Sequence, residues 1–267
     1  MNTTILTAYI DGIGLLGPGL SGWPGSLAIL AGHQPHLGLA TVLPSPALLP
    51  PAERRRSGAI VKLTLATGLE AVAAAGLDPA MLPCVYTSSS GDGQNCHEIC
   101  QTLASSDRHI SPTRFHNSVH NAAAGYWSIA TGAMTPISVL CAYDASFGAG
   151  LLETMTQVQV DNVTTLLIAC DTTYPEPLHH ARPIPDNFGI AMVLAPAAGA
   201  HSLARISVSL SSDDAHTLDD EALEQLRLGI PAARGLPLLC ALAQGRNGRI
   251  VLDYFEHLRI AVDITLC

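Results

Sequence analysis

Residues 137–158 read ISVLCAYDASFGAGLLETMTQV, and this stretch decides the fold. Its first six residues, 137–142, are mostly apolar and predict a strand. Residues 146–158 predict a helix, so that only Tyr143, Asp144 and Ala145 separate the two elements. A strand that leads almost at once into a helix is typical of an α/β protein.

The sequence before this stretch repeats the alternation of strands and helices. The expected elements are strands at 5–10 and 84–87, and helices at 23–30, 53–75, 96–104 and 121–131. Gly12, Gly14, Gly17 and Gly19 are expected to form turns after the first strand. Residues 34–52 are rich in proline and predict an irregular connection.

The pattern changes after Pro196. Before it, the apolar run 163–169 predicts a buried strand of the parallel type, without alternation, and residues 189–194 predict another strand. Beyond it, the expected elements are alternating strands at 203–210, 249–254 and 258–266, and helices at 221–228 and 232–243. Alternation suits antiparallel strands with one buried face. The sequence therefore predicts a long α/β part followed by a short remainder.

The composition excludes several classes of function. Charged residues make up 13% and apolar residues 48% of the chain, and the mean hydropathy is +0.30, which argues against disorder. Thirteen basic residues against 22 acidic ones give a net charge of −9. A chain with this charge offers no surface that would follow a phosphate backbone, so nucleic acid is not an expected partner.

Membrane insertion, secretion and metal binding are not expected either. No uninterrupted apolar stretch reaches about 18 residues, and residues 1–20 lack the basic start of a signal peptide. Seven cysteines with irregular spacing do not form a secreted disulfide framework, so a cytoplasmic location is expected. Cys96 and Cys100 flank His97, but no second close pair of cysteines completes a metal site.

Three segments carry a resemblance to a known family. They are YIDGIGLLGPGLSGWPGSLAILAG (9–32), PPAERRRSGAIVKLTLATGLEAVAAAGLDP (50–79) and SPTRFHNSVHNAAAGYWSIATGAMTP (111–136). Together they resemble the ketoacyl synthases of the thiolase-like fold. The resemblance implies one thiolase-like α/β domain of layered sheets and helices over 1–267. Its first half, 1–197, would be essentially complete, and its second half, 198–267, strongly reduced.

In that family a cysteine stands where the strand turns into the helix. A thiolate there is stabilised by unpaired backbone amides and the helix dipole, so it can attack a thioester. Alignment without gaps from Asn121 through Pro136 places Asp144 at this position, with Tyr143 or Cys141 as alternatives if the register shifts. The carboxylate of Asp144 is expected to cap the following helix. The histidine and glycine motifs of the family's second half are missing, so the resemblance implies a degenerate site without catalysis.

The stretches 117–132 and 143–153 are similar to one subgroup, the short chain-length factors of aryl polyene biosynthesis clusters. The resemblance implies a heterodimer with an active ketosynthase that elongates chains on acyl carrier protein, with no cofactor. A half-length chain would leave apolar surface for this partner to cover. The residues that this implies for the partner interface and acyl tunnel are Arg114, Phe115, His116, Asn117, His120 and Asn121.

Two alternatives remain open from the sequence. The chain could be an active acyltransferase or thioesterase that uses Cys141, or Asp144 with His120 as a base. His116 and His120 are four residues apart and could share one helix face. The other alternative is a homodimeric scaffold without a ketosynthase partner.

Overall fold

The computed structural model describes residues 5–267. Residues 1–4, which begin the N-terminal segment discussed above, lie outside this range. The strands are β1 (Leu6–Gly17), β2 (Leu20–Ser21), β3 (Cys84–Thr87), β4 (Ile137–Leu140), β5 (Thr165–Asp171), β6 (Phe188–Ala195), β7 (Ala204–Ser211), β8 (Gly248–Phe255) and β9 (Leu258–Leu266). The α-helices are α1 (Trp23–Leu30), α2 (Pro51–Arg56), α3 (Ala59–Ala74), α4 (Gly93–Ala104), α5 (Pro112–His116), α6 (Ala122–Thr131), α7 (Ser146–Asp161), α8 (Leu178–Ala181), α9 (Glu221–Gly229) and α10 (Leu236–Ala243). Short 3₁₀ turns cover η1 (Pro79–Met81), η2 (Tyr143–Ala145) and η3 (Pro231–Gly235).

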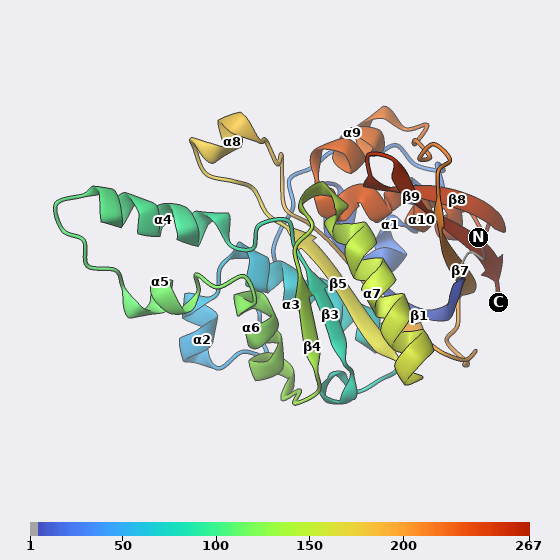
Figure 1. Cartoon of the computed structure of the whole chain (residues 1–267), viewed down its shortest axis with the longest axis horizontal. Helices are drawn as coiled ribbons and strands as arrows, with labels where there is room; N and C mark the ends of the chain where they lie inside the picture. Colours follow the sequence, from blue (N-terminus) through green and yellow to red (C-terminus); the bar gives the residue numbers. More distant parts are fainter. Residues whose placement is uncertain (1–4) are drawn as a thin grey trace.

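The strands form one mixed sheet in the order β4-β3-β5-β6-β1-β7-β9-β8, with β2 paired to β1. β3 runs parallel to β4 and β5, and the other pairs are antiparallel. The first five strands in this order come from the first part of the chain and the last three from the remainder. Within residues 5–267, β4 and β8 are therefore the two edges of the sheet (Figure 1).

Two helices cover opposite sides of the first five strands. α3 packs on β1, β5 and β6 and contacts α6, and their apolar side chains form one core. α7 packs on β3 and β5 and also contacts β8 and η3 of the second part. The side chains of α7 thus belong to a second core, which both parts of the chain share. This layering of helices and sheet is the predicted α/β class.

The glycines of the first strand have a different role from the one expected. Gly12, Gly14 and Gly17 lie inside β1, which continues to residue 17, and do not form turns. A Cβ at Gly12 would approach the carbonyl oxygen of Ala71 to 2.1 Å, and one at Gly14 would approach that of Thr67 to 1.9 Å. These glycines allow the backbone of α3 to lie directly against the strand.

Most predicted elements are present with shifted ends. The helix expected at 53–75 is two helices, because Ser57 has an extended backbone that separates α2 from α3. The helix expected at 232–243 begins with the 3₁₀ turn η3 before α10. Across residues 5–267, the longest helices are too short or too polar to cross a membrane.

The sheet face of the second part that points away from α7 is polar. Arg205, Ser207 and Ser209 lie on this face of β7, and Arg249 of β8 forms two hydrogen bonds of 2.8 Å with Asp263 of β9. Such a face needs no covering helix layer.

Candidate functional site

The turn between β4 and α7 has a strained backbone at one residue. Tyr143 has a φ of 53°, and Asn162 is the one other non-glycine residue with a positive φ in the described part of the chain. A bulky residue with positive φ is uncommon and requires support from its surroundings. The sharp turn expected between strand and helix is present, and its most strained residue is Tyr143, one position before Asp144.

Asp144 does not cap the helix that follows. No side chain caps α7; instead, the Ser146 hydroxyl donates to the Tyr143 carbonyl at 2.7 Å and accepts from the Ala142 amide at 3.1 Å. The Asp144 carboxylate is paired with Arg182, and Arg234 lies 3.6 Å away. The N-cap prediction for Asp144 is wrong because two arginines from distant segments provide its partners.

Arg182 covers the strained turn. Its guanidinium carbon lies 3.6 Å from the centre of the Tyr143 ring, within the range of a cation–π contact. The same guanidinium donates to the Tyr174 hydroxyl at 3.3 Å. Arg182 directly follows α8, in the proline-rich 174–187 segment (Figure 1). This segment thus places a cation over the ring and beside the carboxylate that follows it.

Arginines and carboxylates continue this pairing into the second part of the chain. Arg234 lies 3.9 Å from Asp253, and Asp253 also pairs with Arg227. Arg227 is only 5% exposed, and its Nε donates to Glu224 at 2.7 Å. Hydrogen bonding from Arg227 is the main cause that lowers the pKa of Glu224 below its ordinary value. Three arginines balance three carboxylates, so the network is neutral and links η2 to α9, η3 and β8.

Cys141 lies beside the turn and not on it. It follows the last residue of β4, and its thiol donates to the Ser89 carbonyl at 3.2 Å. The Ser89 hydroxyl is 3.2 Å from the Tyr174 hydroxyl, which also contacts Arg182. Cys141 is exposed, five residues before the first residue of α7. Its thiol therefore lacks the helix-terminus position that stabilises a thiolate.

A buried carboxylate positions the surrounding loops. Asp171, at the end of β5, accepts hydrogen bonds from the Ser89 amide and the Ala232 amide, both at 2.8 Å. The Ser88 hydroxyl lies 3.4 Å from the same carboxylate. Burial raises the pKa of Asp171, and these hydrogen bonds oppose that shift. Asp171 thus connects β5, the 88–93 turn and η3 around the β4–α7 turn.

The residues expected at the partner interface occupy one side of the molecule in different environments. Phe115 is 68% exposed, and Arg114 pairs with Glu98 of α4. Asn117 is buried, and its amide bonds to the Arg56 carbonyl at 3.3 Å and to the Tyr126 hydroxyl at 3.2 Å. His116 and Asn121 are exposed.

His116 and His120 do not share one helix face, so this alternative is not realised. α5 ends at His116 and α6 begins at Ala122, so His120 lies in the turn between them. The His120 Nε2 atom lies 3.1 Å from the Ser88 carbonyl. Asp144 has its arginine partners, and His120 has Ser88, so the structure does not join these two residues as an acid–base pair.

Apolar side chains are exposed on this side of the chain. Phe115, Val119, Ile129 and Met134 all project into solvent from the 111–136 segment. All four residues of β4, the edge strand next in sequence, are partly exposed. Figure 1 shows α4, α5, α6 and β4 on this side, away from β8 and the two termini. The set of Phe115, Val119, Ile129, Met134 and β4 is called the β4 surface below.

Sequence reasoning missed the arginines of the site. Arg182 lies in the proline-rich 174–187 segment and Arg234 in the helix expected at 232–243, and neither residue was a candidate from the sequence. One signal was available: only 13% of the chain is charged, so an arginine in an otherwise apolar or proline-rich segment has a good chance of a specific partner. No metal site emerges from residues 5–267, where no three His, Cys, Asp or Glu side chains gather as ligands.

The fold is that of the thiolase-like class, as comparisons with known proteins show. Residues 33–245 match the family described as "Beta-ketoacyl synthase, N-terminal domain". Since the match covers well over half of its length, the chain belongs to this family. No curated protein is significantly similar to the sequence.

Solved structures of similar length share the fold. One is a chain from the complex of the ketosynthase ApeO with its chain length factor ApeC from Xenorhabdus doucetiae. It matches with a TM-score of 0.73 and 23% identity, and the match covers 97% of this chain and 99% of the other. A chain of the ishigamide ketosynthase/chain length factor matches with a TM-score of 0.69 and 14% identity. The match covers 97% of this chain and 99% of the other. A chain of AntDE:AntF, an acyl-carrier protein in complex with its ketosynthase, matches with a TM-score of 0.73 and 10% identity. The match covers 99% of this chain and 100% of the other.

Proposed function

We propose that this protein is a catalytically degenerate, ketosynthase-like subunit that pairs with an active β-ketoacyl synthase and shapes its acyl tunnel, as a chain-length factor. The observation that carries the proposal is the β4–α7 turn. Its strained residue is Tyr143, covered by Arg182, and its next residue is the paired Asp144. The position suited to a nucleophile therefore holds an aromatic ring.

The chemistry of the turn supports the absence of catalysis. Attack on a thioester requires an ionised thiol or a hydroxyl activated by a base. The Ser146 hydroxyl is buried and already donates to the Tyr143 carbonyl. The Asp144 carboxylate is paired with Arg182 and lies 3.6 Å from Arg234, so its oxygens already have partners. Neither Ser146 nor Asp144 is therefore free to act as a nucleophile in acyl transfer.

The β4 surface supports pairing with a second chain. An edge strand with unpaired backbone groups, bordered by exposed apolar side chains, is a surface that proteins normally cover. The strand at the opposite edge, β8, is partly covered by its own chain, since the Val251 amide bonds to His216 at 3.0 Å. The ApeO–ApeC structure, whose chain has this fold, is a complex of a ketosynthase with its chain length factor.

The 114–121 segment would act across that interface. Phe115 is exposed on α5, which lies on the same side of the molecule as β4 (Figure 1), and its ring would contact the partner directly. A ring that projects toward the partner's acyl tunnel would limit the space for the growing chain. Acyl carrier protein would then act through the complex, as the AntDE:AntF structure illustrates for its own ketosynthase.

Co-purification tests the proposal. A tagged copy expressed in its native host is expected to purify with a ketosynthase, identified by mass spectrometry, in a one-to-one complex measured by native mass. Ile129→Lys should abolish this complex, because it places a charge in the β4 surface. Leu210→Lys serves as a matched control, since Leu210 on β7 is also 47% exposed. A stable monomer or a homodimer of the wild type, without a ketosynthase, would contradict the proposal.

A further inference from the structure

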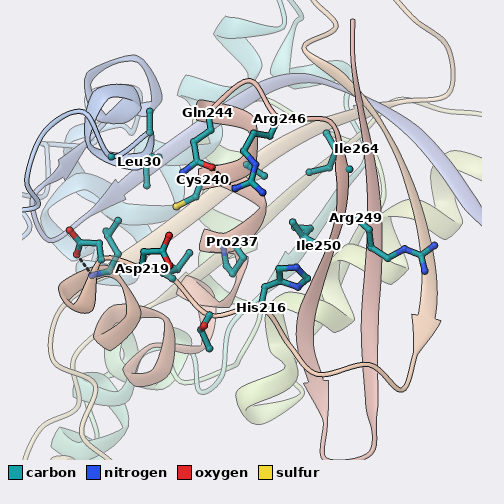
Figure 2. A pocket seen from close by; sticks show the side chains of 18 of the residues that line it. Leu30, His216, Asp219, Pro237, Cys240, Gln244, Arg246, Arg249, Ile250 and Ile264 are labelled. Carbon is teal, nitrogen blue, oxygen red and sulfur yellow. Dashed lines mark hydrogen bonds between the residues drawn. The ribbon is translucent and has the colours of Figure 1, made fainter.

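A second feature of the molecule lies outside the β4–α7 turn. It is an open cleft of about 480 Å³ between the end of α1, the 216–220 segment, α10, the start of β8 and the end of its partner strand β9 (Figure 2). Clefts of about 300–1,000 Å³ are of the size that binds small molecules. Neither the turn nor the β4 surface includes its residues.

The cleft follows from the shortened second part of the chain. In the first part, α7 precedes β5 and packs on both β5 and its neighbour β3. In the second part, α10 precedes β8 and packs on it, but β8 is an edge and has no strand equivalent to β3. The residues of α10 from Leu236 to Leu242 are buried, and the cleft opens beside the last turn of this helix, next to the start of β8.

The floor of the cleft is apolar. The buried apolar side chains of the lining include Leu30, Leu223, Cys240, Ala241, Ile250 and Ile264. Burial raises the pKa of the Cys240 thiol to about 12, so this thiol is neutral and contributes as an apolar group. The floor therefore suits the hydrocarbon part of a ligand.

The rim carries opposite charges on its two sides. Figure 2 shows Gln244 and Arg246 on one side, Asp219 on another, and Cys240 and Pro237 between them. The Arg246 guanidinium donates to the Gln244 side chain at 3.1 Å, and among residues 5–267 it has no carboxylate partner. Arg249, by contrast, is already paired with Asp263. Arg246 is thus the guanidinium of the cleft that is available for an anion.

The edge of β8 argues against a peptide as the occupant. His216 accepts a hydrogen bond from the Val251 amide through Nδ1, and its own amide donates to the Val251 carbonyl at 2.9 Å. A peptide that extended the sheet would need these two backbone groups of Val251. A small molecule needs neither.

We propose that this cleft binds small monocarboxylates with an apolar body, the carboxylate on Arg246 and the hydrocarbon on the floor beside Cys240. Asp219 and Asp220 line the opposite side and would repel a second negative charge. The site therefore selects monocarboxylates over dicarboxylates of the same length. This inference is independent of the proposed function of the β4–α7 turn.

Calorimetry with the purified full-length chain, in whatever complex it forms, tests the proposal with octanoate as the probe. Octanoate is expected to bind at least about tenfold more tightly than octanol or the dicarboxylate suberate, since about 1.4 kcal/mol corresponds to a factor of ten. Arg246→Gln should weaken octanoate about tenfold, whereas Arg205→Gln, on the exposed face of β7, should not. Asp219→Asn should reduce the preference for octanoate over suberate.

A steric variant locates the site. Ala241→Trp is expected to abolish octanoate binding because Ala241 lines the cleft, and circular dichroism would confirm that each variant is folded. The absence of octanoate binding to the wild type at millimolar concentration overturns the proposal. Equal binding of octanol, or unchanged binding by Arg246→Gln, overturns it as well.

Discussion

Arg182 holds its guanidinium 3.6 Å above the ring of Tyr143, the residue with a left-handed backbone at the turn from β4 to α7. The two residues are separated by 39 positions, so the contact depends on the fold and not on local sequence. The same arginine pairs with Asp144, the next residue along the turn. The turn is thus held by charge pairing and stacking with a distant segment of the chain.

The backbone of Tyr143 gives the first prediction. Tyr143→Ala should destabilise the protein by about 1 kcal/mol, because it loses the cation–π contact and keeps the left-handed conformation. Tyr143→Gly loses the same contact but relieves the strain, so it should be about 1 kcal/mol more stable than the alanine variant. Urea unfolding of the two variants measures this difference. If alanine were the more stable of the two, the strain at residue 143 would be disproved.

The order of strands and helices was predictable because hydrophobic patterning is local. β3 and β5 are continuous apolar runs, and their prediction from the sequence is confirmed to within two residues at either end. Gly12 and Gly14 show the limit of local reasoning. Glycine signals a turn or a close backbone contact, and only the position of α3 decides between the two.

The site was less accessible to sequence reasoning. Tyr143 and Asp144 were singled out by the alignment with the ketoacyl synthases, which places them where the strand turns into the helix. The partners of these residues come from the segment after α8 and from η3, and no pattern links positions that far apart. The N-cap expectation for Asp144 failed for this reason, since tertiary ion pairs replaced a local hydrogen bond.

Acyl transfer gives the second prediction. After incubation with an acyl-carrier-protein thioester, intact mass is expected to show no covalent adduct on the wild-type chain, because the turn offers no activated nucleophile. The thiol of Cys141 is bound to a carbonyl and distant from a helix start, so Cys141→Ala should give the same spectrum. An adduct that disappears in Cys141→Ala would instead establish an acyltransferase or thioesterase that uses this thiol.

Asp171 gives the third prediction. Asp171→Asn should lower the free energy of unfolding by about 1–3 kcal/mol, because one carboxylate oxygen that accepts a buried amide becomes an NH₂ donor. Chemical denaturation measures the change. Asp214→Asn is the matched control, since Asp214 is exposed, and its effect should stay within about 0.5 kcal/mol. Equal effects of the two substitutions would show that Asp171 does not hold the loops together.

The fourth prediction concerns acid stability and rests on Glu224. Its carboxylate accepts from the Arg227 Nε at 2.7 Å and from the Leu218 amide at 3.0 Å, and its pKa is lowered below the ordinary value of 4.5. A lowered pKa in the folded state means that the ionised form is favoured by folding. The contribution of Glu224 to the free energy of unfolding is therefore complete above pH 4.5, and it is lost as the pH falls through the folded-state pKa.

Glu224→Gln isolates this contribution from that of the other acidic residues. At pH 7 the variant should be less stable by about 1–3 kcal/mol, the usual effect of losing a hydrogen bond to a charged group. As the pH falls below 4.5, the difference between wild type and variant should shrink, because the wild-type carboxyl becomes protonated. Urea unfolding of both proteins between pH 7 and pH 3 measures this difference. If the difference in unfolding free energy stayed constant over the whole pH range, the charge of Glu224 would not contribute, and Asp253 alone would stabilise Arg227.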